Sequence, residues 1–533
     1  MTETPVLIVG GGPVGLAAAI GLSRQNVPSI LVERHPGTAL HPKARGVDVR
    51  TMEVFRGWGI EAAVRAAGLP AEEHGFFFRG PTLASPEFER FGGGGRSGDA
   101  RRLSPTTWLV IGQDALEPVL LDAARSLGRC DIRFGAELAG FEQDGDGISA
   151  TVVDRASART ERIRAGNLVG ADGSGSRTRE LLGIDLDGRG PLVWNASILF
   201  RADLADLIAD RRSAVYYLTG GDPDARPRGY PVSVGNPPAN GVLLTIDNRD
   251  RWLLVVGLAS EASPPPEPER AADVVRAAVG IADLDVEILG TLPWTPAARV
   301  ATRYRCGRAF LCGDAAHEMT PSGAFGLNVG IQDAHNLAWK LGLVGQEVAG
   351  PGLLESYEQE RRPIGRFATE QSYLQFSGAH APRPFGNWGV ILGSTYASQA
   401  VVADDTPPPA VEDPATDYVA VARPGHRAPH AWLGDGETRS TIDLIDDGLT
   451  VLSIDPSWAA AVGRLPRELV ELVSSRTLAG DLAPADPVSF DEAYGIGDGG
   501  AVLIRPDGYV GWRAARAAGQ VELEPAIRRI LDR

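Results

Sequence analysis

Glycines and a carboxylate near the start of the chain have the types and the spacing of a dinucleotide site. Gly10, Gly12 and Gly15 form a G-x-G-x-x-G pattern directly after the apolar run 6–9. In this pattern the first glycine permits a tight turn, the second lets a pyrophosphate approach the backbone, and the third lets a helix pack closely on the strand. Glu33 ends the next apolar run, where a carboxylate can accept hydrogen bonds from both ribose hydroxyls. The pattern leaves open which dinucleotide binds, and whether it is a substrate or a prosthetic group.

Two later carboxylates follow apolar runs in the same way. Asp172 belongs to an apolar strand predicted over 168–173 that ends in Asp-Gly, and Asp314 to another over 309–314 that ends in Gly-Asp. The carboxyl ends of parallel strands are where open α/β sheets bind their ligands. After Asp314, a loop rich in proline and glycine leads to a helix predicted over 329–347. Its approach, 326–328, would present backbone N–H groups to an electron-rich ligand.

Regular elements must hold these residues in place. The run 6–9 indicates a buried parallel strand, 16–25 a buried helix with small residues, and 29–32 a second strand. The N-terminus of such a helix offers free N–H groups and a positive potential to phosphates. The alternative is a glycine-rich turn in an ordinary strand–helix–strand unit, and the acid at the end of the second strand favours the nucleotide site.

Length and charge exclude several classes of function. The chain has 533 residues, which suggests about three domains. Its formal net charge of −16 argues against nucleic acid and against an anionic membrane surface as partners. The first residues lack the basic and apolar segments of a signal peptide, and no stretch is typical of a transmembrane helix.

The chain has few residues for metal or disulfide chemistry. Cys130, Cys306 and Cys312 contain no C-x-x-C pair and cannot build a disulfide framework. No metal-ligand cluster is visible, so we expect no bound metal, and the cysteine content favours a reducing cytoplasm. His317 follows Asp314 closely, and we interpret it as a structural histidine rather than a general base.

The three motifs together resemble those of the class A flavoprotein aromatic hydroxylases, the para-hydroxybenzoate and phenol hydroxylase family. They occur in the same order and at similar separations, and the resemblance covers essentially the whole chain. Within that family the chain is most similar to the FAD-dependent polyketide hydroxylases of aromatic antibiotic pathways. Many FAD and NAD proteins share the glycine pattern, whereas the Gly313-Asp314 segment with its loop and helix is far more specific.

The resemblance implies a role for each motif. The glycine pattern would hold the ADP half of FAD, Asp172 would touch both FAD and NAD(P)H, and Asp314 would bind the ribityl chain. Leu327 and Asn328 would stabilise the N1–C2=O edge of the flavin. The cofactor-binding residues predicted in this way are Gly10, Gly12, Pro13, Val14, Gly15, Glu33, Arg34, Lys43, Arg45, Gln113, Asp172, Asp314, Gly326, Leu327 and Asn328.

Residues 41–53 resemble the family's Pro-Arg-Ala segment, which contacts the pyrophosphate and the flavin edge. Lys43 stands where the family usually has arginine, which keeps the charge but loses the bidentate fork, and Arg45 is the alternative for this contact. For Arg50 and Glu53 we favour an i,i+3 ion pair on a solvent-exposed helix.

Two further positions bear on the flavin. Gln113 resembles a glutamine that opens a helix and contacts the flavin in the family, although it could simply lie near a helix N-cap. Phe325 lies in Gly323-Ala324-Phe325-Gly326, where the family often has Gly-Gly-(Gln/Met)-Gly, and would narrow the site near the isoalloxazine. The substrate of the relatives therefore does not transfer directly.

Residues 192–300 break the alternation of strands and helices and suggest an antiparallel sheet. The resemblance implies that this sheet roofs the substrate pocket. Tyr216 and Tyr217 are adjacent, so only one can face the pocket, and one of them is a candidate substrate contact. The strands are predicted over 197–202, 214–218, 242–246 and 252–258. Other aromatic residues available to line the pocket are Trp194, Trp252, Trp294 and 76–78, most of which we expect to be core.

The proline-rich segment 406–414 predicts a linker. Beyond it the chain resembles the thioredoxin-like C-terminal domain of the phenol hydroxylase branch, but without a cysteine it cannot exchange dithiols, so its role is structural or at an interface. Strands are predicted over 440–444 and 449–454, a helix near 468–474 and a hairpin over 501–513 with a Pro-Asp-Gly turn. The predicted α/β fold comprises a Rossmann-type FAD-binding domain (1–190 and 297–385), an antiparallel-sheet substrate domain (191–296) and a thioredoxin-like domain (415–533).

One complete glycine pattern implies one tightly held nucleotide, FAD, and a transient NAD(P)H. The resemblance then implies a monooxygenase that hydroxylates a phenolic, polycyclic aromatic substrate of polyketide type with O₂, through a hydroperoxide at C4a of the flavin. The alternatives are Baeyer–Villiger insertion or epoxidation from the same fold, an FAD-free NAD dehydrogenase, and a non-catalytic subunit. The sequence does not indicate the catalytic base, the choice between NADH and NADPH, or the oligomeric state.

Overall fold

The central strands of the first sheet run parallel in the order β7-β2-β1-β10-β19. These strands are β1 (Thr2–Val9), β2 (Ser29–Glu33), β7 (Cys130–Phe134), β10 (Thr160–Gly170) and β19 (Ala309–Leu311). They are apolar on both faces because each face is covered, as parallel sheets require. The strands β8 (Ala136–Gln143) and β9 (Ile148–Asp154) cover one face with residues such as Leu138 and Val152. The predicted Rossmann-type architecture is confirmed in this computed structural model.

The other face of the sheet is covered by three helices, α1 (Pro13–Arg24), α5 (Gln113–Leu127) and α8 (Phe325–Gly345). Leu16 and Ile20 of α1 share one core with Leu116 of α5 and Ile331 of α8. Helix α8 begins earlier than the predicted start at residue 329, which places Leu327 and Asn328 in its first turn. The structure describes residues 2–69, 77–91, 97–220, 241–380, 386–497 and 499–533.

The middle of the chain forms a second sheet of order β16-β12-β15-β14-β13-β4-β5. Its pairs are antiparallel except for the parallel pair β13–β4, and the predicted antiparallel sheet is confirmed. The four predicted strands are present as β12 (Asn195–Arg201), β13 (Val215–Leu218), β14 (Gly241–Thr245) and β15 (Arg251–Gly257), and they are joined by β16 (Glu287–Trp294), β4 (Phe77–Gly80) and β5 (Glu89–Phe91).

The strands β4 and β5 correct the predicted division into domains. All of 1–190 was assigned to the FAD-binding domain, but 77–91 pairs with the middle sheet. The segment 77–91 is short and far from residue 191 in sequence. The pairing of Phe78 with Tyr216 shows that it is part of the middle sheet. Phe76 lies outside the described residues.

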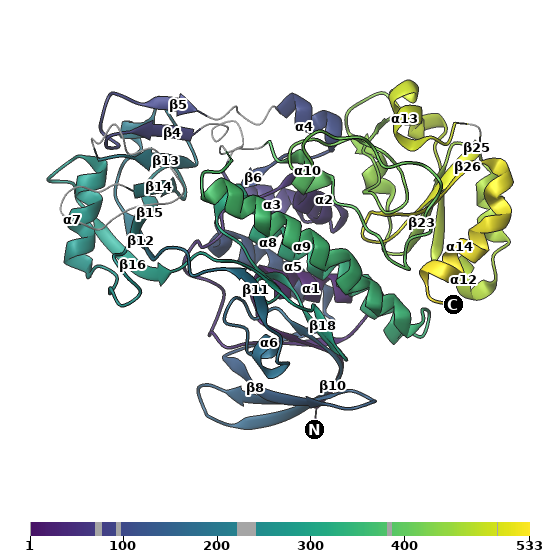
Figure 1. Cartoon of the computed structure of the whole chain (residues 1–533), viewed down its shortest axis with the longest axis horizontal. Helices are drawn as coiled ribbons and strands as arrows, with labels where there is room; N and C mark the ends of the chain where they lie inside the picture. Colours follow the sequence, from purple (N-terminus) through teal and green to yellow (C-terminus); the bar gives the residue numbers. More distant parts are fainter. Residues whose placement is uncertain (1, 70–76, 92–96, 221–240, 381–385, 498) are drawn as a thin grey trace.

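The two faces of the middle sheet have different partners. Helix α7 (Pro268–Val279) covers one face, where Ile198, Tyr216 and Trp252 lie in a buried core. Because side chains alternate along a strand, Val215, Tyr217 and Leu244 project from the opposite face. In Figure 1 this sheet and α7 lie on one side of the central domain, and the C-terminal domain lies on the other.

The C-terminal domain has a four-stranded sheet of order β24-β23-β25-β26, with β23 and β24 parallel and the other pairs antiparallel. The predicted hairpin is present. The predicted strand 440–444 is wrong, because Ser440 caps a 3-10 helix (Thr441–Leu444) instead. The segment 468–474 divides between a helix and a strand. The elements are β23 (Leu449–Ser453), α11 (Ser457–Gly463), α12 (Arg467–Val470), β24 (Val473–Thr477), β25 (Gly499–Ile504), β26 (Val510–Arg516) and α14 (Leu523–Ile530).

The long helix α9 (Glu355–Phe376) runs beside α8 between the two outer parts of the molecule (Figure 1). Within the described residues, no helix combines the length and the apolar character that crossing a membrane requires.

Candidate functional site

The glycine turn packs so tightly that two of its three positions accept only glycine. Gly10 has a φ of 108°, and a Cβ there would lie 2.3 Å from the carbonyl oxygen of Ala171. A Cβ on Gly15 would lie 1.9 Å from the carbonyl oxygen of Gly10. At Gly12 a Cβ would meet only Glu117 Oε1, at 3.9 Å, so the space in front of Gly12 is open. Because Gly12 caps α1 without a side-chain hydrogen bond, the first N–H groups of α1 are available to an anion.

Glu33 is held beside this turn by two backbone N–H groups. Its Oε2 accepts the N–H of Gly11 at 2.6 Å, and its Oε1 accepts the N–H of His35 at 2.8 Å. A carboxylate has about four acceptor positions, so these two bonds leave capacity for ribose hydroxyls. The neighbouring Arg34 is exposed.

The sheet brings the predicted acidic residues to one edge. Val9 is in register with Val32 and Gly170, and Gly170 is in register with Leu311. The residues that follow these strand ends therefore lie side by side at the carboxyl edge of the sheet, as a ligand site of this fold requires. They are Gly10, Glu33, Asp172 and Asp314.

Asp314 keeps an exposed side chain although Gly313 and Ala315 on either side are buried. Desolvation by the surrounding protein raises the pKa of Asp314, and the charges of His317 and Lys43 oppose this effect. Lys43 also opposes the increase that burial causes in the pKa of Glu117. Lys43 is therefore within electrostatic reach of both Glu117, beside Gly12, and Asp314.

The start of α8 has the geometry of a second N–H site. Its N-cap, Ala324, has a φ of 55° and makes no side-chain capping bond. A Cβ on Gly326 would meet only Asp314 Oδ1 at 3.8 Å and Met319 Cβ at 3.9 Å, so the space before this turn is open and borders Asp314. The turn 326–328 therefore borders this open space, and the contact of its backbone N–H groups with the flavin edge remains a prediction.

The side chain of Asn328 has a structural function. Its Nδ2 donates to the carbonyls of Gly46, at 3.0 Å, and Ala324, at 2.7 Å, and its Oδ1 accepts the N–H of Asp48 at 2.9 Å. Only the backbone of Asn328 is therefore available to a flavin.

The carboxylate of Asp172 is engaged by its own helix. Its Oδ1 accepts the hydroxyl of Ser176 at 2.6 Å, and its Oδ2 accepts the N–H and hydroxyl of Thr178 at 2.9 and 3.0 Å. These bonds fix the segment that leads into α6 (Arg177–Leu181). The predicted contact of Asp172 with both FAD and NAD(P)H remains a prediction.

The structure corrects the prediction for Arg45. Its guanidinium donates to the carbonyl of Ala214, just before β13, at 3.1 Å and to the carbonyl of Thr245 at the end of β14. Arg45 therefore ties the segment 41–46 to the sheet and does not replace Lys43 as the pyrophosphate contact.

Gln113 reaches the glycine turn through a neighbour. Its Nε2 donates to Glu117 Oε1 at 2.7 Å, the atom that lies opposite Gly12. Glu117 also accepts the N–H of Ala39 at 2.5 Å. The burial of Glu117 could not be predicted from the sequence. The apolar pattern of a helix does not show which of its polar residues faces a loop.

Arg50 and Glu53 form the predicted ion pair, at 2.9 Å, but the predicted solvent exposure is wrong. The side chains of Arg50 and Glu53 are 5% and 0% exposed. The C-terminal domain covers them, with Arg427 paired to the same carboxylate of Glu53. A helix pattern cannot reveal this, because the covering residues lie far away in the sequence.

Of the three candidate substrate contacts, two are core residues and one lies on the open face of the middle sheet. Tyr216 is fully buried in the core under α7 and donates to the carbonyl of Arg211 at 2.9 Å, which removes it as a pocket residue. Phe325 is 1% exposed in a core with Ile364 of α9, so it does not line an open site either. Tyr217 is half-buried on the opposite face, with Phe77 edge-on at 6.2 Å between centroids.

His317 is structural, as interpreted. It is fully buried and its Nε2 lies 2.7 Å from Asp333 Oδ2. Asp333, which the sequence analysis missed, also accepts the N–H of Gly313 at 3.1 Å.

These features fit FAD. Uncapped N–H groups at α1 and α8 suit the pyrophosphate and the electron-rich flavin edge, and Glu33 suits a ribose. The charge of Lys43 acts on both Glu117, beside the start of α1, and Asp314, beside the start of α8. The FAD binding domain family matches residues 3–372, and the family of aromatic-ring hydroxylase C-terminal domains matches residues 421–533. The chain belongs to the FAD-dependent aromatic hydroxylases. It is an FAD-dependent monooxygenase, so the alternative of an FAD-free dehydrogenase does not hold.

Named relatives cover this hydroxylase from end to end. A putative polyketide hydroxylase of Streptomyces halstedii is 43% identical, over 99% of this chain and 96% of the relative. The tetracenomycin A2 monooxygenase-dioxygenase of Streptomyces glaucescens is 39% identical, over 100% and 97%. The crystal structure of aklavinone-11 hydroxylase with FAD and aklavinone superposes with a TM-score of 0.86, at 33% identity and with complete coverage of both chains. The flavin-dependent monooxygenase PieE, with FAD and substrate, gives a TM-score of 0.90 at 33% identity over 99% of both chains.

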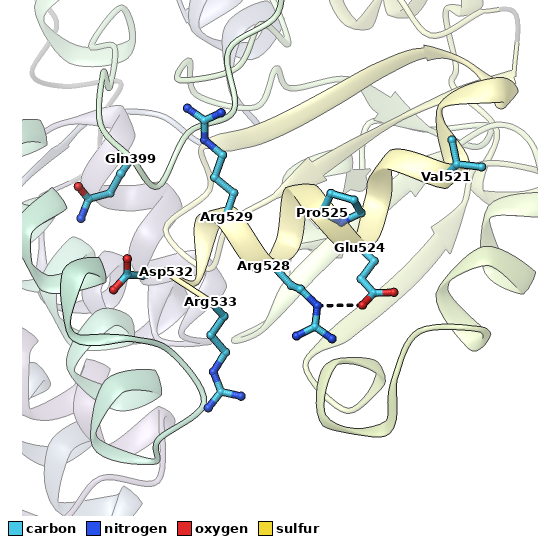
Figure 2. A pocket seen from close by; sticks show the side chains of 8 residues that line it. All are labelled: Gln399, Val521, Glu524, Pro525, Arg528, Arg529, Asp532 and Arg533. Atoms are coloured by element: carbon cyan, nitrogen blue, oxygen red, sulfur yellow. Dashed lines mark hydrogen bonds and ion pairs between the residues drawn. The ribbon is translucent and has the colours of Figure 1, made fainter.

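A pocket of about 830 Å³ in this hydroxylase lies along α14 (Figure 2). Arg528 is paired there with Glu524 at 2.8 Å, and none of the lining residues is a predicted cofactor contact. Among the described residues, no group of three His, Cys, Asp or Glu side chains is placed to hold a metal.

Proposed function

We propose that this FAD-dependent monooxygenase oxygenates a phenolic, polycyclic aromatic substrate of polyketide type, using NAD(P)H and O₂. Relatives named as polyketide hydroxylases and as enzymes of tetracenomycin and aklavinone support the substrate class. The observation that carries the proposal is the half-buried face of the middle sheet that is turned away from α7. An extended apolar and aromatic wall suits a flat, polycyclic ligand.

The wall is built by alternation along neighbouring strands. Val215 and Leu244 are paired across β13 and β14, and Tyr217 follows on the same face. All three are half-buried and none belongs to the core under α7. A ring system lying on this wall would displace water from the reacting edge, which a monooxygenase needs to avoid loss of reduced oxygen as peroxide. Arg45 holds both strands in place by its bonds to Ala214 and Thr245.

The cofactor residues act by binding and orienting. We assign the pyrophosphate to the first turn of α1 and to Lys43, and a ribose to Glu33. We assign the ribityl chain to Asp314 and the flavin edge to the N–H groups of α8. When bound, FAD supplies the means of passing electrons from a nicotinamide to O₂. No side chain is assigned as a catalytic base.

An oxygen-electrode assay tests the proposal. The FAD-loaded protein is given phenolic polycycles with NADH or NADPH, and catalase is added to separate coupled oxygenation from peroxide release. We expect substrate-dependent oxygen uptake that is insensitive to catalase. The absence of such uptake with every phenolic polycycle would overturn the substrate class. An NMR structure of the product separates hydroxylation from Baeyer–Villiger insertion or epoxidation, since each adds one oxygen.

The state of the cysteines bears on the compartment in which the protein works. Cys130, Cys306 and Cys312 are all free, and Cys312 is buried. Unpaired thiols of this kind support a reducing compartment, so we propose a cytoplasmic enzyme.

A further inference from the structure

The hairpin turn of the C-terminal domain is buried against helices α8 and α9 of the FAD-binding domain. Arg505 is 0% exposed and Asp507 is 1% exposed. Arg505 donates to both carboxylate oxygens of Glu360 on α9, at 2.6 and 2.8 Å, and to Asp507 at 2.5 and 3.1 Å. A Pro-Asp-Gly turn forms without a buried arginine, so Arg505 is not needed for the turn itself. Its burial is explained by the groups that it binds on the FAD-binding domain.

Two side chains of α8 join the same cluster. Asn336 Nδ2 donates to Glu360 Oε2 at 2.8 Å and to Asp507 Oδ2 at 2.9 Å, and Lys340 Nζ lies 2.6 Å from Glu360 Oε2. Burial alone would raise the pKa of Glu360, but Arg505 and Lys340 hold it well below its usual value. Burial lowers the pKa of Lys340 to about 8. Fully buried ionic bonds thus attach both helices to the C-terminal turn.

A second set of contacts runs from the same hairpin toward the flavin site. The ring of Tyr509 is stacked on Tyr396 with 3.8 Å between centroids. The hydroxyl of Tyr396 accepts Arg361 of α9 at 3.2 Å, and Arg361 Nε donates to Asp333 of α8 at 2.7 Å. Arg361 also donates to the carbonyl of Val329, in the early part of α8, at 3.1 Å.

This second set ends at the flavin residues. Asp333 Oδ2 accepts the N–H of Gly313, the residue before Asp314, and the same oxygen contacts His317 Nε2. Arg361 and Asp333 therefore fix both the early part of α8 and the Gly313-Asp314 turn, and Arg361 is itself bonded to Tyr396, on which Tyr509 of the C-terminal domain is stacked.

We propose that Arg505 is a positioning residue for the flavin site. It ties α8 and α9 to the C-terminal turn through Glu360, and its guanidinium lies 5.0 Å from the centroid of the Tyr396 ring, where the contacts that lead to the Gly313-Asp314 turn begin. Buried ion pairs add little net stability compared with apolar packing, whereas their directional bonds fix the groups that make them. This role gives a function to a domain that has no cysteine for dithiol chemistry.

The full-length Arg505→Met variant tests the proposal. The protein is freed of FAD, and FAD is titrated back while its fluorescence and its visible absorption are followed, at a temperature where circular dichroism shows the protein folded. We expect the dissociation constant of FAD to rise at least tenfold and the shape of the bound flavin spectrum to change. The matched control is Arg513→Met in the same hairpin. Arg513 pairs with Asp404 at 2.7 Å and is 9% exposed, but this pair does not involve α8 or α9.

A lower unfolding temperature alone, with FAD bound as by the parent protein, would overturn the proposal, because a purely structural arginine gives that result. Equal weakening in the Arg513 control would overturn it as well. If Arg505→Met does not fold, the same FAD titration is made with Asn336→Ala. This variant removes the hydrogen bond from α8 to Asp507 and leaves the ion pairs of Arg505 intact. Weaker FAD binding by this variant supports the proposal, and unchanged binding contradicts it.

Discussion

Asn328 in the first turn of α8 and Gly46 in strand β3 (Gly46–Val47) are joined by a hydrogen bond of 3.0 Å. The bond connects the segment that carries Lys43 to the helix start that borders Asp314. These two parts of the proposed flavin site are far apart in sequence, and the same amide side chain also accepts the N–H of Asp48. One buried side chain therefore closes the gap between the segment that carries Lys43 and the start of α8.

Asn328→Ala should loosen this closure. Removal of the amide leaves the N–H of Asp48 and the carbonyl of Gly46 unpaired in a buried place, which should lower the free energy of unfolding by about 2–3 kcal/mol. The binding of FAD should weaken at the same time. Denaturant unfolding of the apo-protein and titration with FAD measure the two effects. Gln332→Ala, one turn further along α8, is the control, and an equal effect there would contradict the role of Asn328.

Glu33→Ala should weaken the retention of FAD. The variant loses the acceptor for the ribose and also the bonds to Gly11 and His35. Hydrogen bonds to a charged group contribute about 1.5–3 kcal/mol, so the dissociation constant should rise about 10- to 100-fold. Gel filtration followed by the ratio of flavin to protein absorbance measures it. Glu137→Ala, at an exposed surface pair, should retain FAD. If Glu33→Ala holds FAD as tightly as the parent, the assignment of the ribose is wrong.

Asp48→Asn should stabilise the protein at neutral pH. Asp48 caps α2 (Val49–Gly57) by accepting the N–H of Thr51, and burial raises its pKa from 3.8 to about 6. Between these values the unfolded chain releases the proton while the folded chain keeps it, so stability falls as the pH rises from about 4 to 6. Asparagine caps a helix equally well, and it removes this loss of up to about 3 kcal/mol.

The measurement for Asp48 is the free energy of unfolding between pH 4 and pH 7, for the parent and the variant. Asp486 is the control because it caps α13 (Pro487–Tyr494) at an exposed site, where hydrogen bonds from Ser489 lower its pKa. Because the pKa of Asp486 is lowered rather than raised, its ionised carboxylate stabilises the folded state. Asp486→Asn should therefore destabilise the protein above the ordinary pKa of aspartate. An Asp48→Asn variant with the pH dependence of the parent would show that Asp48 does not titrate as described.

Glu53→Gln should be strongly destabilising. The carboxylate lies between Arg50 and Arg427, and its loss leaves two buried guanidinium groups without a counter-charge. Breaking a buried pair in this way lowers the free energy of unfolding by about 3–5 kcal/mol. Arg177 and Glu180 offer a matched i,i+3 pair at 3.3 Å whose side chains are 55% and 58% exposed. Glu180→Gln should change stability by less than about 1 kcal/mol, and similar losses at both sites would refute the effect of burial.

Tyr217→Ala and Tyr216→Phe should separate catalysis from stability. Tyr217 is on the wall face, so its removal should raise KM for an aromatic substrate with little change in the unfolding temperature. Tyr216→Phe removes the hydrogen bond to the carbonyl of Arg211, which should lower stability by about 1 kcal/mol and leave KM unchanged. Steady-state kinetics and thermal unfolding of both variants test this. The reverse pattern would place the substrate on the α7 side of the sheet.

Much of the proposed nucleotide site could be predicted from local sequence patterns. Gly15 packs against Gly10 of the same turn and Glu33 ends a short strand, so their roles depend mainly on nearby residues, whereas the close approach of Ala171 to Gly10 is a contact of the folded protein. Asp314 could be placed for the same reason, since an apolar run followed by a loop and a helix has few possible folds. The four strands of the middle sheet were predictable because alternation and turn residues are also local signals.

Most of the regular elements, the dinucleotide turn and the family could therefore be predicted from local patterns, although the strand expected over 440–444 could not. Long-range packing settled which residues turn inward: Arg45 reaches the middle sheet, Arg427 covers Arg50 and Glu53, and Tyr216 lies in the core while Tyr217 lies on the wall. It also decided that the hairpin of Arg505 presses against α8. The physical reason is that burial and pairing of charges depend on segments that are hundreds of residues apart, and no local pattern records which of them meet.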